Sequence, residues 1–341
     1  MLSASTRAAQ ELMLHLHGQY FFAIGAAAKF GYADHLASGA KTADELARLT
    51  DTHGPTVYRL LRALGDIGIF EEREGHFANT PQSELLRADH PTSLRPAALF
   101  LCHESIVTTW ANLDYSVKTG KPAFDHVYGT GFWHHMKEHP DVGPLFNATM
   151  ASYTSSQIEA VLDAYDFSGI QRLCDVGGGQ GRMLAAILAK YPKMRGILFD
   201  QPHVIGGAAP TLERAGVSAR CEQIGGSFFE SVPAEADAHL LKAIIHDWND
   251  EDCLRILEAV NRASKPGQKL LVIDAVVQTN RAPGNTLDLN KMVDLVMLLF
   301  TSGGRERTER DFAALLGASN FELVRVLPTQ SPISIIEARA K

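Results

Sequence analysis

The stretch that decides the fold is Leu173-Cys174-Asp175-Val176-Gly177-Gly178-Gly179-Gln180-Gly181, in which an apolar run passes into a glycine-rich turn. This pattern predicts a buried strand followed by a tight turn into a helix, with backbone that a ligand can approach closely. The dinucleotide fingerprint GxGxxG does not fit, because Arg182 or Leu184 stands where its third glycine belongs. A phosphate-binding P-loop does not fit either, because no GK[ST] follows. The stretch alone therefore predicts an α/β ligand site without naming the ligand.

Outward from this stretch, residues 166–341 alternate between short apolar runs and helical patterns. The runs at 173–176, 197–199, 239–245 and 270–277 are typical of buried strands in a doubly wound parallel sheet. The last two runs, at 321–327 and 333–338, have no helix between them and predict an antiparallel hairpin at one edge. The C-terminal half is therefore expected to form a Rossmann-like α/β domain.

A carboxylate follows the second predicted strand. Asp200 comes 19 residues after Gly181, where a carboxylate can accept hydrogen bonds from both ribose hydroxyls of an adenosine. This favours a nucleoside ligand. The alternative is a structural role for Asp200, as the N-cap of a helix after Pro202.

Residues 1–100 have mainly helical patterns and resemble a winged-helix unit. Thr42 and Glu45 have the spacing of a capping box, a second helix begins near Gly54, and residues 68–78 read as a small β-wing. Winged helices often bind DNA, but this segment carries nine Lys/Arg against eleven Asp/Glu and has no surplus of positive charge for phosphates. We predict a domain that does not bind nucleic acid.

Residues 101–165 are expected to be a helical connector rich in aromatic and sulfur side chains. Such a segment between two domains is a plausible wall for a flat, apolar substrate, since ligand sites favour domain interfaces. The alternative is that most of these side chains are simply core.

Bulk composition is that of a soluble protein. The 341 residues suggest two domains, and the net charge of −7 argues against general affinity for nucleic acid or anionic membranes. The four cysteines form no CxxC pair, so we expect neither disulfides nor a zinc cluster, and a cytoplasmic location. The apolar residues 20–28 are too short to span a bilayer and are predicted to be a buried helix face.

Six motifs then become specific in combination. They are Asp175-Val176-Gly177-Gly178-Gly179-Gln180-Gly181, Phe199-Asp200-Gln201-Pro202-His203-Val204, Gly225-Gly226-Ser227-Phe228-Phe229, Lys242, His246-Asp247-Trp248 and Gly303-Gly304-Arg305-Glu306-Arg307-Thr308. In order and spacing the chain closely resembles the S-adenosylmethionine-dependent small-molecule O-methyltransferases of plant phenolic and bacterial secondary metabolism. The resemblance covers nearly the whole chain and implies an N-terminal dimerisation domain, a homodimer, and S-adenosylhomocysteine as the product of the cofactor.

The resemblance implies roles for five cofactor-binding residues. Gly177 would lie against the methionine part of S-adenosylmethionine, and Asp200 would hold the ribose. Ser227 and Phe228 would border the adenine, and Lys242 would line the cofactor pocket. Family members often have Asp where Ser227 stands, so we expect a rearranged hydrogen bond there worth about 1 kcal/mol.

The resemblance also implies that His246 is the general base. A free phenol has a pKa of about 10, so its ionisation at neutral pH costs roughly 4 kcal/mol, and a positioned imidazole can take that proton while the oxygen is held in line with the methyl group. Asp274 and Glu306 would orient the imidazole. Asp274 replaces the Glu common in plant members and is one methylene shorter, which puts its geometry in question. Asp247 is expected to be structural, as an N-cap of the helix at 251–263 or a brace of the turn, with a direct role as the alternative.

The acceptor pocket is predicted from aromatic, sulfur and small polar side chains. Its expected residues are Phe132, Trp133, Met136, Asn147, Met150, Met297, Phe300 and Thr301. Their character implies a flat, mostly apolar, hydroxylated aromatic or polyketide-like acceptor, and no metal is expected. Three alternatives stay open: an N- or C-methyltransferase; a relative repurposed for decarboxylation, hydroxylation or pericyclic chemistry; and a non-catalytic DNA-binding dimer.

Overall fold

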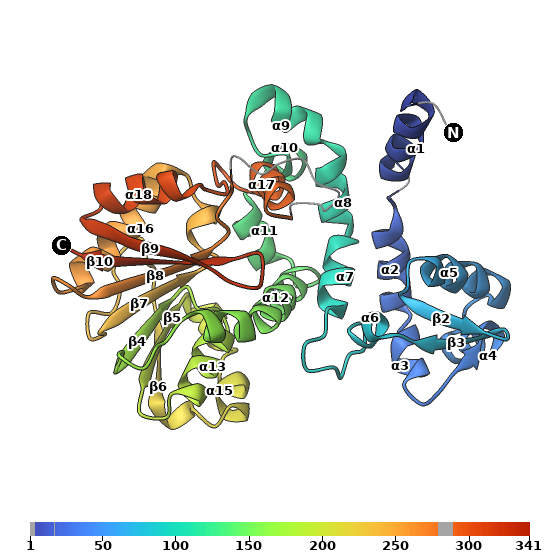
Figure 1. Ribbon diagram of the computed structural model, residues 1–341, viewed down its shortest axis with the longest axis horizontal. Coiled ribbons are helices and arrows are strands. Elements are labelled where there is room, and N and C mark those ends of the chain that lie inside the picture. The colour runs from blue at the N-terminus through green and yellow to red at the C-terminus, as the bar shows by residue number, and fades with distance from the viewer. Residues whose placement is uncertain (1–3, 17, 279–288) are drawn as a thin grey trace. The chain divides into compact units, whose positions relative to one another are not determined.

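The computed structural model describes residues 4–16, 18–278 and 289–341, and it contains two compact units (Figure 1). One unit consists of Met1–Val107 with Pro140–Ser152, and the other of Thr108–His139 with Tyr153–Lys341. The boundaries fall within α8 (Glu104–Ala111), between His139 and Pro140, and within α12 (Gly143–Ala164). The boundaries predicted at residues 100 and 165 stay a prediction.

The first unit is mainly helical and carries a small antiparallel sheet of order β1-β3-β2. Its elements are α1 (Ala4–Leu16), α2 (Tyr20–Lys29), α3 (Tyr32–Leu36), β1 (Lys41–Thr42), α4 (Ala43–Thr50), α5 (Gly54–Asp66), β2 (Phe70–Arg73), β3 (His76–Asn79), α6 (Pro81–Glu84) and α7 (Arg95–Leu101). The sequence of helix, helix and two-stranded wing is the winged-helix arrangement that the sequence predicts.

Local signals position these helices. The Thr42 hydroxyl accepts a hydrogen bond from Glu45 N at 3.2 Å and the Glu45 carboxylate accepts one from Thr42 N at 2.7 Å, which is the predicted capping box. On α5, Val57, Leu61 and Leu64 are buried in the core of this unit. Their spacing of three and four residues places them on one face of the helix, which packs inward.

The prediction of a buried helix face over residues 20–28 is right only for its second half. Gly25, Ala27 and Ala28 are buried, whereas Tyr20, Phe21 and Phe22 are between 42% and 45% exposed. The aromatic half of α2 therefore presents apolar surface in the single chain.

The second unit is built on a seven-stranded sheet of order β6-β5-β4-β7-β8-β10-β9. Its strands are β4 (Arg172–Val176), β5 (Arg195–Asp200), β6 (Cys221–Gly225), β7 (Ala238–Lys242), β8 (Lys269–Asp274), β9 (Phe321–Pro328) and β10 (Ser334–Ala340). The first five strands pair in parallel, and β9 and β10 form the predicted antiparallel hairpin at the edge. This is a doubly wound sheet of the Rossmann-like class.

Helices cover both faces of this sheet. Figure 1 shows α16 (Asp250–Ala263) and α18 (Glu309–Ala318) over one face, and α13 (Arg182–Lys190) and α15 (Ala209–Arg214) over the other. Each face has its own buried core. With both faces covered, strands such as β4 and β8 are buried at every position after the first residue, and most of those residues are apolar.

Two strand ends and one whole strand in this unit differ from the prediction. β7 ends at Lys242, before the end of its apolar run, because Ile244 and Ile245 are buried in a turn rather than in the sheet, and β8 ends at Asp274. The edge strand β6 was not predicted, since Glu222 and Gln223 give it a polar, exposed centre.

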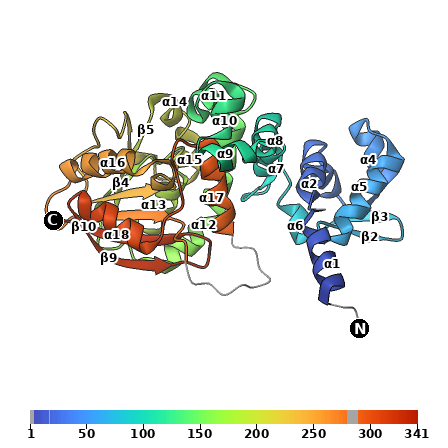
Figure 2. The ribbon, with the colours of Figure 1, turned by 90° about the horizontal axis from the view of Figure 1, so that it is seen from above.

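The remaining helices of the second unit come before the sheet and near the end of the chain. They are α9 (Leu113–Thr119), α10 (Ala123–Tyr128), α11 (Phe132–Glu138), α14 (Pro202–Ile205) and α17 (Leu289–Phe300), with short 3-10 helices at Ser218–Arg220 and Ile245–Asp247. Figures 1 and 2 both place α17 beside α9 and α10, and these helices are in contact.

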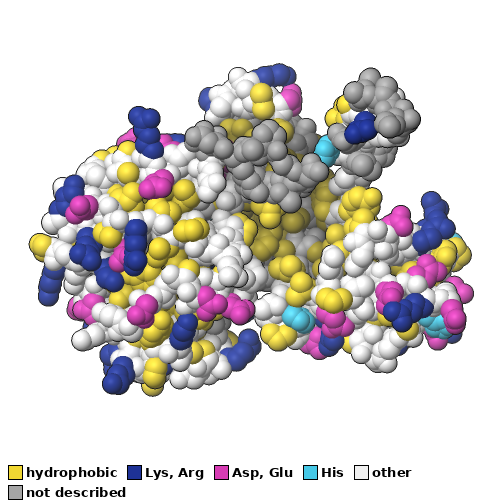
Figure 3. All heavy atoms as spheres, viewed as in Figure 1, with side chains coloured by type: hydrophobic (Ala, Val, Ile, Leu, Met, Phe, Trp, Pro, Cys, Tyr) yellow, Lys and Arg dark blue, Asp and Glu magenta, His cyan; other side chains and the backbone are white. Residues whose placement is uncertain are grey.

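Among the described residues, none of the helices combines the length and the apolar character needed to cross a bilayer. On the face drawn in Figure 3, acidic and basic side chains are interspersed. That face offers no broad surface of one sign.

Candidate active site

The glycine-rich loop after β4 requires glycine at several positions. Gly177, Gly179 and Gly181 have φ of 72°, 59° and 75°, the left-handed region that favours glycine. A Cβ on Gly177 would lie 2.5 Å from Ile244 Cδ1 and 3.5 Å from Phe228 Cε1. The loop therefore brings bare backbone to the carboxyl edge of the sheet, where α/β proteins bind ligands.

Asp200 at the end of β5 faces this loop. Its Oδ2 accepts a hydrogen bond from Gly179 N at 2.7 Å, and its Oδ1 accepts one from Gln201 N at 2.6 Å. Burial raises the pKa of Asp200, and these two backbone donors oppose that rise. Each oxygen keeps a lone pair for a further donor, and Gln201 rather than Asp200 is the N-cap of α14. The capping alternative is therefore wrong, and the carboxylate fits a ribose diol.

Apolar and polar groups border the same loop. Phe228 contacts Phe229 at 4.9 Å and Trp248 at 6.0 Å between ring centroids, both edge to face. The Ser227 hydroxyl accepts a hydrogen bond from Phe229 N at 3.3 Å. Burial lowers the pKa of Lys242, against the carboxylates of Asp274 and Asp175. Together with the bare loop and Asp200, these groups fit a nucleoside cofactor that has an apolar base and a polar tail.

The turn after β7 carries His246 to the same edge of the sheet. Ala243 has a φ of 53°, an uncommon value for a residue with a side chain, and its N donates to Ile273 O at 3.0 Å. This tight turn ends the strand and leads into the 3-10 helix Ile245–Asp247. His246 is thereby held on a short, strained connection between β7 and α16.

A carboxylate fixes the tautomer of His246. His246 Nδ1 lies 2.8 Å from Glu306 Oε1, and their side chains are 16% and 1% exposed. Because an ionised carboxylate only accepts, Nδ1 carries the hydrogen and Nε2 is the basic nitrogen of the neutral ring. Nε2 lies 3.5 Å from Asp247 Oδ1.

Three carboxylates surround this imidazole. Burial lowers the pKa of His246, but Asp247, Asp274 and Glu306 outweigh it and raise the pKa to about 10. Burial also raises the pKa of Asp274 to about 7 and that of Asp247 to about 6, in both cases against the opposing charge of His246. The cluster strongly favours the imidazolium form.

Asp274 differs from Glu306 in its contacts. It lies at the end of β8, is 1% exposed, and neither of its oxygens has a hydrogen-bond partner among the described residues. It acts on His246 through charge and not through a direct hydrogen bond. The shorter side chain thus departs from the orienting role expected for it.

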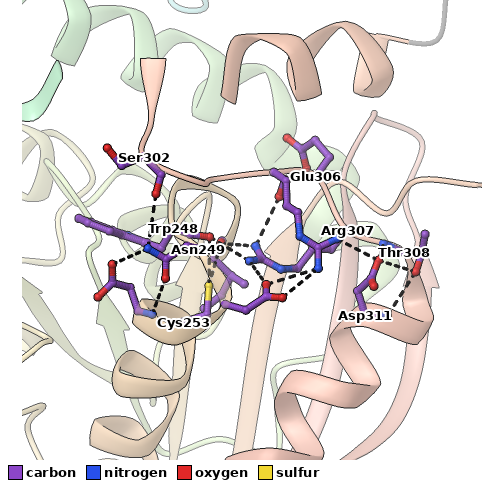
Figure 4. A network of polar contacts seen from close by, with 12 residues as sticks. Trp248, Asn249, Cys253, Ser302, Glu306, Arg307, Thr308 and Asp311 are labelled. Carbon is purple, nitrogen blue, oxygen red and sulfur yellow. Dashed lines mark hydrogen bonds and ion pairs between the residues drawn. The ribbon is translucent and has the colours of Figure 1, made fainter. Parts of the chain in front are cut away.

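Arg307 joins the loop that carries Glu306 to the turn that carries His246 (Figure 4). Its side chain is fully buried, and it donates to Ile245 O at 2.6 Å, Trp248 O at 2.9 Å and Asp250 Oδ1 at 2.7 Å. The two carbonyls flank His246 in the chain. Arg307 therefore fixes the turn that carries His246 relative to the neighbouring Glu306.

The predicted acceptor residues fall into two groups. The ring centroids of Phe132 and Phe300 lie 5.6 Å apart, and both rings pack against Phe124. Trp133 stacks on Trp248, with 6.3 Å between the ring centroids. Met136, Met297 and Thr301 are also buried in the second unit, and the Thr301 hydroxyl donates to Met297 O at 2.8 Å. Asn147 and Met150 belong to the first unit, so their assignment to the same pocket stays a prediction. The described residues contain no group of three His, Cys, Asp or Glu that could hold a metal.

Comparisons with known proteins identify the family. A model described as the O-methyltransferase domain matches residues 110–322, and one described as the O-methyltransferase dimerisation domain matches residues 13–89. The chain belongs to the O-methyltransferase family. It is similar to the phenazine O-methyltransferase PhzM of Lysobacter antibioticus, at 42% identity over 92% of this chain and 90% of that protein.

Solved structures agree with this membership. The methyltransferase matches the crystal structure of LaPhzM with a TM-score of 0.91 at 40% identity, over 98% of this chain and 99% of that one. It matches CalO1, a methyltransferase in calicheamicin biosynthesis in its S-adenosylhomocysteine-bound form, with a TM-score of 0.87 at 31% identity over 100% of both chains. The resemblance inferred from sequence is confirmed, and the cofactor of this enzyme is S-adenosylmethionine.

Sequence reasoning missed three polar residues of this O-methyltransferase's site. Asp247 is not the N-cap of α16, since Asn249 caps that helix by accepting from Asp252 N at 2.9 Å, and Asp247 instead lies against His246. Asp294 Oδ1 accepts from Glu306 N at 2.8 Å. The structural role of Arg307 was not predicted either. Only the position of Asp247, next to the proposed base, could have drawn attention to it.

Proposed function

We propose that this enzyme methylates a hydroxyl group of a small, flat, mostly apolar aromatic acceptor, with His246 as general base. The observation that carries the proposal is the pairing of His246 Nδ1 with Glu306 Oε1 at 2.8 Å, which leaves Nε2 as the basic nitrogen. S-adenosylmethionine supplies an electrophilic methyl group on its sulfonium sulfur. We assign its binding to Gly177, Asp200, Ser227, Phe228 and Lys242.

The chain's own residues supply the proton acceptor. A free phenol has a pKa of about 10, so its phenolate is scarce at neutral pH and costs roughly 4 kcal/mol to form. Neutral His246 takes the phenol proton at Nε2, and Asp247, Asp274 and Glu306 stabilise the resulting imidazolium, as the pKa of about 10 indicates. The phenolate oxygen is then paired with a cation and keeps its nucleophilic electron pair.

The aromatic side chains of the second unit favour a flat acceptor. Trp133 is 39% exposed and lies nearly parallel to Trp248, with 21° between the ring planes. Phe132 and Phe300 form an apolar surface in the same unit. PhzM, by its name, acts on a phenazine, which is a planar aromatic. We propose an acceptor of this shape that bears a hydroxyl group.

We also propose that the enzyme is a homodimer joined through its N-terminal domain. The match to a dimerisation domain covers residues 13–89. Within the first unit, Leu12 and Leu16 on α1 are 59% and 66% exposed, and the aromatic half of α2 is exposed as well. Apolar surface of this extent is expected to be covered by a second copy.

Replacement of His246 tests the proposed chemistry. His246→Ala is expected to lower kcat by about two to four orders of magnitude, because the proton acceptor is lost, while S-adenosylhomocysteine affinity by calorimetry stays within about twofold. His76→Ala, at an exposed histidine of β3, is the matched control and should turn over normally. Normal turnover by His246→Ala would refute the role of His246 as base.

A further inference from the structure

Arg182 stands out among the partly buried arginines of the second unit. It is the first residue of α13, directly after the glycine-rich loop, and its N-cap Gly181 offers no side chain. The first turn of α13 contains no acidic residue. A cation at a helix N-terminus lies at the positive end of the helix dipole, which is the unfavourable end for it.

The contacts of Arg182 leave its charge uncompensated. Nη1 donates to Ser155 Oγ on α12 at 3.2 Å, whereas Nε is buried and has no acceptor among the described residues. None of the carboxylates in the described part of the chain forms an ion pair with it. By contrast, Arg307 is paired with Asp250, and Arg220 donates to Leu188 O in α13 and to Met194 O in the loop after it.

The surroundings of Arg182 destabilise its positive charge further. Burial lowers the pKa of its guanidinium, and the charge of Arg214 on α15 lowers it as well. A partly buried guanidinium without a counter-ion carries part of the cost of burying a charge, and a bound anion offsets that cost. The dipole of α13, the positive charge of Arg214 and the Nε of Arg182 that has no acceptor all favour an anion beside Arg182.

We propose that Arg182 binds the carboxylate at the methionine end of the cofactor. The guanidinium presents paired N–H donors that match the two oxygens of a carboxylate. Arg182 directly follows the loop that the proposed function assigns to the methionine part, so the inference rests on that assignment. A carboxylate on the acceptor has the same chemistry and is separated from it by the test.

The test measures binding, without any acceptor and without turnover. S-adenosylhomocysteine and its decarboxylated analogue, S-adenosyl-3-thiopropylamine, are titrated calorimetrically into the wild type and into Arg182→Gln. We expect the wild type to prefer the carboxylate-bearing ligand, and Arg182→Gln to bind it about 10- to 100-fold more weakly while its affinity for the analogue changes little.

Two further variants keep the result interpretable. Arg214→Gln removes an exposed neighbouring charge and should keep the wild-type preference. Arg182→Lys keeps the positive charge without the paired N–H donors of the guanidinium, and it should retain part of the preference. It replaces Arg182→Gln if Arg182→Gln does not fold.

The outcomes separate this proposal from the proposed function. If Arg182→Gln weakens both ligands equally or neither, the proposal is overturned while cofactor binding stands. If Arg182→Gln keeps the wild-type preference, the anion that Arg182 binds is not the carboxylate of the cofactor, as would be the case for a carboxylate on the acceptor, and the proposal is wrong. If the wild type does not bind S-adenosylhomocysteine, the cofactor-site assignments fail, and this inference fails with them.

Discussion

Replacing Glu306 by Gln should move the acid limb of the pH profile to lower pH. The pKa of His246 rises from 6.5 to about 10 although burial lowers it, so Asp247, Asp274 and Glu306 together carry more than that rise. An opposite charge at close range shifts a pKa by about 1–3 units. Since Glu306 is the one carboxylate in direct hydrogen bond, its neutralisation should lower the His246 pKa by about 1–2 units.

The assay is the pH dependence of kcat/KM, which reports the free enzyme. Because neutral His246 is the active form, activity is lost as pH falls through its pKa, and the wild type should still gain activity between about pH 7 and pH 9. In Glu306→Gln, the acid limb of the kcat/KM profile should lie about 1–2 pH units lower. The maximum kcat/KM should also be lower, because an amide does not hold His246 in one tautomer. Glu309→Gln, at an exposed glutamate of α18, is the control and should keep the wild-type limb. An unchanged limb in Glu306→Gln would refute the electrostatic argument.

Three further predictions follow from the assigned contacts. Asp200→Ala should weaken S-adenosylhomocysteine binding by about 2–3 kcal/mol in calorimetry without unfolding the protein, and unchanged affinity would remove Asp200 from the cofactor site. In Arg307→Lys, the shorter ammonium side chain cannot contact Ile245 O, Trp248 O and Asp250 Oδ1 at the same time. The free energy of unfolding should therefore fall by about 2–4 kcal/mol in denaturant titration, and kcat should fall as well. An unfolding free energy of Arg307→Lys equal to that of the wild type would contradict the anchoring role of Arg307. Light scattering should give twice the 37.2 kDa chain mass, and Leu16→Asp should lower that value, whereas a monomeric wild type would refute the proposed dimer.

Much of the fold was predictable because its signals are local. The Thr42 and Glu45 capping box, the turn at Gly177 and the antiparallel hairpin each depend on residues near one another in sequence. The strand ends were less predictable. Ile244 and Ile245 are as apolar as strand residues, yet the left-handed Ala243 ends β7 before them.

The site was predictable only in part. His246 and Glu306 are 60 residues apart, and no spacing rule brings them together, so their pairing was inferred from the family resemblance. The fully buried Arg307 could not be foreseen, because a charged residue in a polar motif normally faces solvent. Tertiary contacts decide such roles, whereas the capping of α16 by Asn249 is a local contact with Asp252 N.

Transfer of a labelled methyl group tests the central claim most directly. The protein is incubated with methyl-labelled S-adenosylmethionine and a panel of planar phenols, each paired with its amine analogue, and the products are analysed for the position of the label. We predict labelled methyl ethers from at least one phenol. Binding of S-adenosylhomocysteine with no methylation of any acceptor, or label found only on nitrogen, would contradict the claim that this enzyme methylates an aromatic hydroxyl.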